Sequence, residues 1–265
     1  MPELAEVEYF RKRWSPGFDQ KIIRVHLHGA KRIFRGNTEA EITAALNGAT
    51  LLSSDRKAKQ MLFRFSTATL GIHLGMTGEM LVAEPDSTPA KHDHLILYTK
   101  KHALVFRDPR LFGRVRFSPE TTDPAWWKEM PAELTDRSFT VAKMAAILER
   151  RGKAPLKAVL LMQEFFPGIG NWMADEILWR AELSPDRRSG GLTPKATKQL
   201  HHEIKQVVKI SLATIGENYG DPPKGWLFHE RWSAKGICPK HKSPLRTATV
   251  GGRTTRWCPI CQPQD

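Results

Sequence analysis

The C-terminal segment of this chain carries all three of its cysteines, and their spacing limits how that segment can fold. Cys238 and His241 stand three positions apart, as do Cys258 and Cys261, and sixteen residues separate the two pairs. Two such pairs joined by the length of a β-hairpin are typical of a tetrahedral structural zinc site without an open coordination position. We predict one structural Zn2+ bound by these four side chains, because the segment has too few aliphatic residues to fold without a metal.

The same segment has a plainer interpretation, in which the last two cysteines form an isolated pair and His241 is a solvated surface histidine. Arg246, Arg253 and Arg256 lie between the two ligand pairs. Their guanidinium groups are suited to binding phosphate, although they also fit a merely solvated charged face.

The overall charge favours a polyanionic partner. The chain has 41 Lys and Arg against 28 Asp and Glu, a net charge of +13, spread along its length. Such an excess attracts phosphates and releases their counterions, although many basic proteins bind nothing specific. No apolar run approaches the roughly 20 residues that span a bilayer, and no signal peptide opens the chain. We therefore expect an intracellular protein without a membrane partner.

The hydrophobic pattern predicts an α+β fold. Residues 2–14 have apolar side chains at helical spacing, and 21–117 contain short β-type runs typical of a β-sandwich or barrel. A stretch rich in Pro and Trp at 118–137 breaks this pattern, and helices are predicted after it at 140–151, 156–166, 171–181 and 194–215. We predict three domains: an N-terminal β-sandwich with a terminal helix (1–130), a helical domain (131–230) and a zinc-finger β-hairpin (231–265).

The amino terminus offers a nucleophile. A Met followed by Pro is normally removed, which would leave the secondary amine of Pro2 with a pKa near 8 and a usable neutral fraction. Such an amine can attack the C1′ of a sugar and form an iminium. Glu3 and Glu6 share one helix face beside it and could move protons or orient water. Taken alone, the segment better fits an ordinary helix start, with Pro2 as the first helical residue and two acids favoured by the helix dipole.

Several segments, in the same order along the chain, resemble the formamidopyrimidine-DNA glycosylase/endonuclease-eight family. The N-terminal signature is Pro-Glu-Leu-Ala-Glu-Val-Glu at 2–8, and the matching segments that follow are Arg-Lys-Ala-Lys at 56–59, Ile-His-Leu-Gly-Met-Thr-Gly at 72–78, Lys-His-Asp-His at 91–94 and Asp-Pro-Arg-Leu-Phe-Gly at 108–113. In the second half, Gly-Ile-Gly-Asn at 168–171 resembles the helix-two-turns-helix element of the family. The resemblance covers essentially the whole chain.

The resemblance implies roles for individual residues. Lys59 corresponds to a catalytic lysine carried on a strand, Met76 to a side chain that fills the void left by a flipped base, Arg110 to an arginine facing the orphaned base and Phe112 to a wedge. Further DNA contacts are implied for His92, Lys157, Asn171, Glu176 and Arg253. Taken singly, Met76 and Phe112 also fit a hydrophobic core, Arg110 a surface ion pair and Lys59 a solvated lysine.

The resemblance implies a bifunctional DNA glycosylase/AP lyase of base-excision repair. It would excise oxidised bases through a Schiff base on Pro2, with β,δ-elimination and with Glu3, Glu6 and Lys59 assisting. The implied partner is double-stranded DNA with damaged bases or abasic sites, in a basic cleft between two domains of a monomer. We expect a bacterial-type protein of the cytoplasm or nucleoid.

Two other functions fit parts of the sequence. A catalytically inactive damaged-DNA-binding protein would keep the fold without the chemistry, and a zinc-ribbon adaptor would use 167–170 as a helix-hairpin-helix turn. The sequence also departs from the family pattern. Ala5 stands in place of a usual proline, His241 in place of a usual cysteine and Leu111 in place of an arginine found in one branch. With a short segment at 214–225, these departures leave the preferred lesion open.

Overall fold

The computed structural model describes residues 1–28, 32–34 and 36–263. It contains two compact units, Met1–Met130 and Pro131–Asp265. Residues 231–265, predicted as a third domain, lie in the second unit. Among the described residues no helix is long and apolar enough to cross a membrane.

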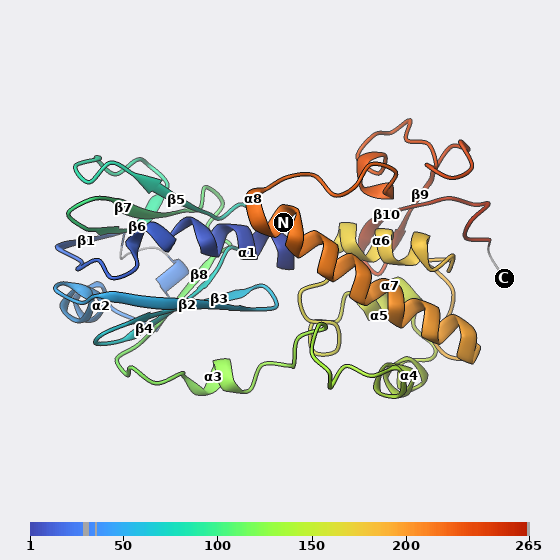
Figure 1. Ribbon diagram of the computed structural model, residues 1–265, viewed down its shortest axis with the longest axis horizontal. Helices are drawn as coiled ribbons and strands as arrows, with labels where there is room; N and C mark the ends of the chain where they lie inside the picture. The colour runs from blue at the N-terminus through green and yellow to red at the C-terminus, as the bar shows by residue number, and fades with distance from the viewer. Residues whose placement is uncertain (29–31, 35, 264–265) are drawn as a thin grey trace. The chain divides into compact units, whose positions relative to one another are not determined.

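The first unit is a sandwich of two antiparallel four-stranded sheets (Figure 1). One sheet has the order β1 (Arg24–Leu27), β6 (Asp93–Tyr98), β7 (Ala103–Arg107), β5 (Glu79–Ala83). The other has the order β2 (Leu51–Lys57), β3 (Gln60–Phe65), β4 (Thr69–His73), β8 (Arg114–Ser118). Fully buried side chains from both sheets, including Phe63, Ile72 and Phe106, form one core. The predicted β-sandwich is confirmed.

Helix α1 (Leu4–Arg13) packs against β5 and β2, which are the edge strands of the two sheets. After its last residue, Trp14 is fully buried and its indole N–H donates to the carbonyl oxygen of Leu81 on β5, at 3.2 Å. The Arg11 guanidinium donates to the carbonyl and hydroxyl oxygens of Ser54 on β2, at 3.1 and 2.8 Å. Because α1 is bonded to both sheets, the start of the chain has a fixed position on the sandwich.

Four short elements complete the first unit: 3-10 helices η1 (Ser15–Gly17) and η2 (Arg32–Phe34), and helices α2 (Glu39–Leu46) and α3 (Ala125–Lys128). Helix α2 lies within 21–117, where we predicted short β-type runs and did not predict a helix. The signal was present, because Thr38 and Glu41 form a capping box in which each side chain accepts from the other residue's backbone N–H.

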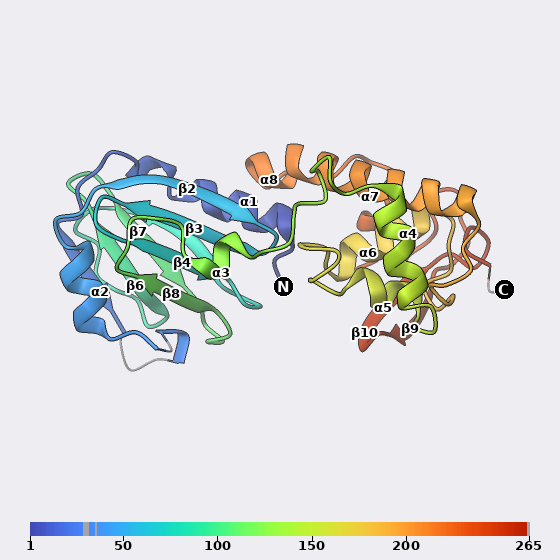
Figure 2. The ribbon, with the colours of Figure 1, turned by 90° about the horizontal axis from the view of Figure 1, so that it is seen from below.

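The second unit is helical and ends in a β-hairpin (Figure 2). Its elements are α4 (Val141–Arg150), α5 (Leu156–Leu160), α6 (Asn171–Arg180), α7 (Pro194–Ala213), α8 (Ile215–Asn218), η3 (Leu227–His229), β9 (Arg246–Val250) and β10 (Arg253–Trp257). The predicted helices are confirmed, but the one expected at 156–166 ends at Leu160 and continues as turns. Helix α6 is almost entirely buried from Trp172 to Trp179, because elements pack around it on several sides.

A buried ion network joins the hairpin to the helices. Lys157 on α5 and Asp175 on α6 are both fully buried, with 2.6 Å between Nζ and Oδ1. Arg231 binds the other carboxylate oxygen at 2.7 Å, and the Lys157 ammonium donates to the Thr255 hydroxyl on β10 at 2.8 Å. Buried charges are tolerated only when they are paired and hydrogen-bonded in this way. The network therefore holds β10 against α5 and α6.

Candidate functional site

The amino terminus lies outside helix α1. We predicted that the helix begins at Pro2, but it begins at Leu4, because Glu3 is extended (φ −102°, ψ −175°) and acts as the N-cap. The Glu3 N–H donates to Oε2 of Glu6 at 3.1 Å, and the Glu3 side chain accepts from the Glu6 N–H. The half-buried Pro2 thus precedes the cap and is not the first helical residue of the plainer interpretation.

Glu3 is the buried acid beside Pro2, with only 2% of its surface exposed. Its burial is unusual for a glutamate at a helix N-cap, because most glutamate side chains face water. The capping box fixes its backbone, and α1 itself is fixed on both sheets. A carboxyl group that is fixed next to a chain terminus is suited to proton transfer at that terminus.

Lys59 lies in the tight turn between β2 and β3 and not on a strand, which corrects the predicted location. The preceding Ala58 has φ +51°, the left-handed conformation that such turns require. Lys59 is only 8% exposed, so it is not a solvated surface lysine. Burial, followed by the positive charges of Lys59 and Arg116, lowers the pKa of His73 on β4. The Lys59 charge therefore acts on His73, the last residue of β4, which pairs with β3.

Two loops carry exposed side chains of the kind that could enter a base stack. Met76, between β4 and β5, is 36% exposed, and Phe112, between β7 and β8, is 46% exposed. Neither belongs to the hydrophobic core, so the core interpretation of both residues is excluded. Arg110 is exposed as well, and its guanidinium carbon lies 4.9 Å from the centre of the Phe112 ring. A pocket of about 200 Å³ opens beside this loop, lined in part by Arg32.

The carboxylate of Asp108 accepts hydrogen bonds from both loops. It is fully buried, and its Oδ1 accepts from the Thr77 hydroxyl at 3.0 Å and from the Arg110 N–H at 3.3 Å. Its Oδ2 accepts from the Gly113 N–H at 2.7 Å. One carboxylate thus sets the loop that carries Met76 relative to the loop that contains Arg110. The sequence motif contains this residue, but the motif alone did not indicate its role.

Gly75 allows the two loops to touch backbone to backbone. Its φ is +65°, and a Cβ at this position would lie 2.4 Å from the carbonyl carbon of Phe112 and 2.5 Å from the Gly113 nitrogen. Real Cβ atoms do not come so close to a rigid backbone. Only glycine therefore fits both the turn and the contact.

His92 lies at the base of the same loop system. Its carbonyl oxygen accepts from the Asp108 N–H at 3.0 Å, and its half-buried ring lies 6.5 Å from that of His94. The structure thus brings His92, Met76, Arg110 and Phe112 together around Asp108.

In the second unit, Asn171 and β10 lie together. Asn171 is the first residue of α6, and its Nδ2 donates to the carbonyl oxygen of Thr254 at 2.9 Å. Its Oδ1 has no hydrogen-bond partner in the described part of the chain. Arg253, the first residue of β10, is exposed. A helix N-terminus, an amide and a guanidinium in one region are suited to binding phosphate.

Lys157 and Glu176, for which DNA contacts were predicted, are both fully buried. The Lys157 ammonium lies in the network with Asp175, and Glu176 Oε2 accepts from the Phe228 N–H at 2.9 Å. Burial raises the pKa of Glu176 to about 8. Direct DNA contacts by these two side chains find no support in this geometry, because neither presents surface to a ligand.

The Cys/His cluster has the geometry of a four-ligand metal site, and its donor atoms all lie within 4.8 Å of one another. The Sγ atoms of Cys238 and Cys261 are 3.6 Å apart, and His241 Nδ1 lies 3.0 Å from Cys261 Sγ. Tetrahedral zinc with Zn–S near 2.3 Å gives S···S distances of about 3.8 Å, so the residues fit such an ion. His241 is therefore a member of the cluster and not an unrelated surface residue.

The surroundings of the sulfurs favour a bound cation. Burial and the sulfurs of Cys238 and Cys258 raise the pKa of Cys261 to about 12, a repulsion between thiolates that a cation would relieve. For Cys258, burial acts in the same direction, but hydrogen bonds from Ser243 and from backbone N–H groups outweigh it and lower the pKa to about 6. The cluster can thus hold a metal ion with thiolate ligands.

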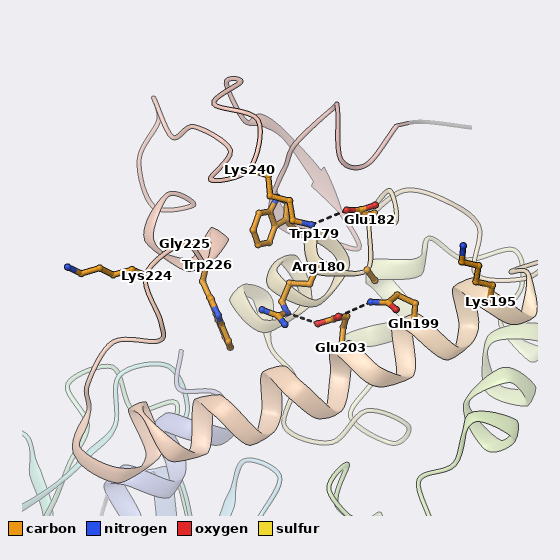
Figure 3. Close-up of a pocket in the computed structure, with 11 residues that line it drawn as sticks. Trp179, Arg180, Glu182, Lys195, Gln199, Glu203, Lys224, Gly225, Trp226 and Lys240 are labelled. Atoms are coloured by element: carbon orange, nitrogen blue, oxygen red, sulfur yellow. Dashed lines mark hydrogen bonds and ion pairs between the residues drawn. The ribbon is translucent and has the colours of Figure 1, made fainter.

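A pocket of about 830 Å³ lies at the C-terminal end of α6, which is the opposite end from Asn171 (Figure 3). Its charged side chains largely pair with one another. Nε of Arg180 lies 2.6 Å from Oε2 of Glu203 on α7, and Lys240 of the finger lies 3.0 Å from Glu182. These ion pairs join α6 to α7 and the residue Glu182 to the finger. The pocket therefore lies at a structural contact between elements of the second unit. No sequence motif indicated it.

Family models match both units of the chain. Residues 1–115 match the family model of the formamidopyrimidine-DNA glycosylase N-terminal domain, and residues 130–220 match that of its H2TH domain. The chain is 32% identical to the formamidopyrimidine-DNA glycosylase of Psychromonas ingrahamii, covering 99% of this chain and 100% of the relative. It is 33% identical to that of Thermus thermophilus, covering 99% and 98%.

Solved structures give the same result. The chain is similar to the formamidopyrimidine-DNA glycosylase of Lactococcus lactis in complex with DNA containing an oxidised pyrimidine, with TM-score 0.88, 26% identity and coverage of 99% of this chain and 100% of that chain. A complex of the Lactococcus lactis protein with DNA containing an abasic site matches with TM-score 0.87, 25% identity and the same coverage.

The raised pKa of Glu176 predicts a pH-dependent stability. The folded protein keeps a proton up to about pH 8, whereas the unfolded chain releases it near the usual pKa of 4.5. Stability therefore falls as the pH rises through this window, and E176Q should remove the loss. In urea unfolding followed by tryptophan fluorescence, we expect E176Q to gain on the order of 3 kcal/mol over wild type between about pH 5 and pH 8.

E182Q is the matched control, because Glu182 is an exposed glutamate just beyond the same helix. Its difference from wild type should stay flat over the window. A flat difference for E176Q as well would show that the Glu176 carboxyl ionises normally.

Proposed function

Because this chain belongs to the formamidopyrimidine-DNA glycosylase family, we propose that it excises oxidised bases from double-stranded DNA and cleaves the resulting abasic site through the amine of Pro2. The chain is a DNA glycosylase of base-excision repair. The finer proposal depends on one observation: Pro2 lies just before the helix cap, beside the buried Glu3, on a helix bonded to both sheets.

The proposed chemistry begins once Met1 has been removed. The lone pair of the Pro2 nitrogen attacks C1′, the bond to the base breaks, and the base leaves with the bonding electrons and takes up a proton. Glu3 then donates a proton to the sugar ring oxygen as the ring opens to a Schiff base. Loss of a C2′ proton expels the 3′ phosphate, and a second elimination expels the 5′ phosphate. Lys59 assists by contacting phosphate and stabilising the leaving group, and Glu6 holds Glu3 in place.

Met76, Arg110 and Phe112 are proposed to fill the space left by the flipped nucleotide. A base must leave the stack before it can be excised, and the unstacked step costs a few kcal/mol. The exposed Met76 and Phe112 side chains can offset part of this cost by packing, and the Arg110 guanidinium can bind the orphaned base. The shared anchor at Asp108 supports this proposal, because it holds all of these groups in one arrangement before DNA binds.

The second unit is proposed to bind the DNA backbone through Asn171 and Arg253, and His92 is proposed to add a contact from the first unit. The net charge of +13 favours such contacts. The similarity to Lactococcus lactis complexes with damaged and abasic DNA supports the same partner. Lys157 is better suited to an indirect role, since its buried ammonium holds strand β10, which begins with Arg253. Glu176 similarly fixes the segment at Phe228.

The metal of the Cys/His cluster is proposed to be one structural Zn2+. Three sulfurs and one imidazole are ligands that zinc prefers in closed sites, and the four residues leave no position for a reactive water. Trp179 of α6 donates its indole N–H to Cys238 Sγ at 3.4 Å. The ion would thus stabilise the finger against α6.

The nucleophile is tested by borohydride trapping on a duplex with an abasic site. Protein lacking Met1 should form a covalent adduct, whereas a form that retains Met1 should form far less, because its Pro2 nitrogen is an amide and cannot attack C1′. P2G exposes the primary amine of glycine, which can still form a Schiff base, and should be trapped more slowly than wild type. E3Q should lower the rate of trapping about 100-fold. E84Q is the control for the same chemical change, since Glu84 is an exposed glutamate that follows β5, and it should trap at the wild-type rate. Equal trapping by the form that retains Met1 would refute the Pro2 mechanism, and no trapping by wild type would favour the inactive damaged-DNA-binding protein.

The loop contact is tested by G75A. A Cβ there must push apart the loops that carry Met76 and Phe112, so we expect kcat/KM on a lesion duplex to fall about tenfold or more. G191A is the control, because Gly191 has φ +74° but no atom within 4 Å of the added Cβ. Both variants should lose similar stability from backbone strain. If their activities fell equally, the contact between the loops would have no role in excision.

The metal is tested by elemental analysis of freshly purified, unchelated protein, which should contain one zinc per chain. C261S should lose the zinc, because the cluster then lacks one of its four ligands. Duplex affinity should fall with the zinc, while near-ultraviolet signals from the sandwich persist. Wild-type protein without bound zinc would contradict the assignment.

A further inference from the structure

Three histidines lie together where β1 pairs with β6 in the first sheet. His26 is on β1 and His28 directly follows it, so the two alternate along the chain and face the same side of the sheet. His94 is their neighbour on β6, and its carbonyl oxygen accepts from the His28 N–H at 3.0 Å. An alternating pair and a cross-strand partner place three imidazoles over one patch of sheet.

The His28 and His94 rings approach each other through nitrogen atoms. Their Nδ1 atoms are 3.4 Å apart. Two nitrogens bound to one tetrahedral metal at 2.0–2.1 Å lie about 3.3–3.4 Å apart, so the observed distance matches one edge of such a site.

A backbone carbonyl orients His94 for this role. His94 Nε2 lies 3.0 Å from the carbonyl oxygen of Asp108, which can only accept a hydrogen bond. Nε2 therefore carries the proton, and the lone pair of Nδ1 faces His28. Metal-binding histidines are typically held by such a hydrogen bond from the other ring nitrogen.

A hydrogen bond between His28 and His94 would not account for the position of His26. Its ring centre is 5.2 Å from that of His28, and its buried Nε2 has no hydrogen-bond partner among the described residues. A buried nitrogen without a partner is costly, and a ligand would remove that cost.

We propose that His28 and His94 form a binding site for a divalent transition metal, with His26 as a third ligand after its ring turns toward them. Imidazole ligands suit Zn2+, Ni2+ and Cu2+ and do not suit Mg2+ or Ca2+. The site is separate from the Cys/His cluster, which lies in the other unit. It does not depend on the proposed catalytic mechanism.

The test uses tag-free protein whose Cys/His cluster has been loaded with zinc. Equilibrium dialysis against Ni2+, with elemental analysis of both metals, should give one nickel per chain with no loss of zinc. H28Q should bind nickel at least about tenfold more weakly, and H26Q should bind it more weakly than wild type. H102Q removes a histidine from the turn between β6 and β7 of the same sheet and should bind nickel like wild type.

A second measurement needs no variant. Paramagnetic Ni2+ should broaden the imidazole NMR signals of His26, His28 and His94 while leaving that of His102 sharp. Absence of nickel uptake at micromolar concentrations, uptake only with an equal loss of zinc, or equal binding by folded H28Q would overturn the proposal.

Discussion

The docking of α1 on the edges of both sheets is the constraint on which the candidate chemistry depends. The indole of Trp14 and the guanidinium of Arg11 bond the helix to β5 and to β2, and the helix buries Leu4, Ala5 and Val7. A terminal proline would otherwise be mobile, because chain ends are poorly ordered unless they are tied down. Here the helix start and its capping box place Pro2 beside a buried acid. A reactive amine gains most when its position is set before substrate binds.

The two exposed loops are also held in position, but by hydrogen bonds to a buried carboxylate. Side chains that enter a base stack must face solvent in the free protein, so they cannot be positioned by burial. Instead the buried Asp108 accepts hydrogen bonds from both loops, and Gly75 lets their backbones touch. In the second unit the same principle operates through Lys157 and Asp175. The side chains that hold these segments are buried, whereas four of those proposed to contact DNA are exposed: Met76, Arg110, Phe112 and Arg253.

The burial of Lys157 and Glu176 could not be predicted from the sequence. Both are charged residues in segments that resemble a DNA-binding element of the family, and on that resemblance we predicted that they contact DNA. Whether a helical residue faces a ligand or the interior depends on what packs against its helix, and α6 is surrounded by neighbours. The same limit applies to Asp108 and to the pair His28 and His94. Their roles arise from segments that are distant in the chain and adjacent only after folding.

The sequence by itself determined the α+β class, the sandwich followed by helices, the four residues of the Cys/His cluster and the membership of Pro2, Met76 and Phe112 in a family motif. These depend on local spacing and periodicity, which the chain carries at every stage of folding. Only the tertiary structure decided that α1 starts at Leu4, that Lys59 lies in a turn, that Met76 and Phe112 are exposed and that Lys157 and Glu176 are buried. Exposure and contact are properties of packing between segments far apart in the chain, so local spacing does not specify them.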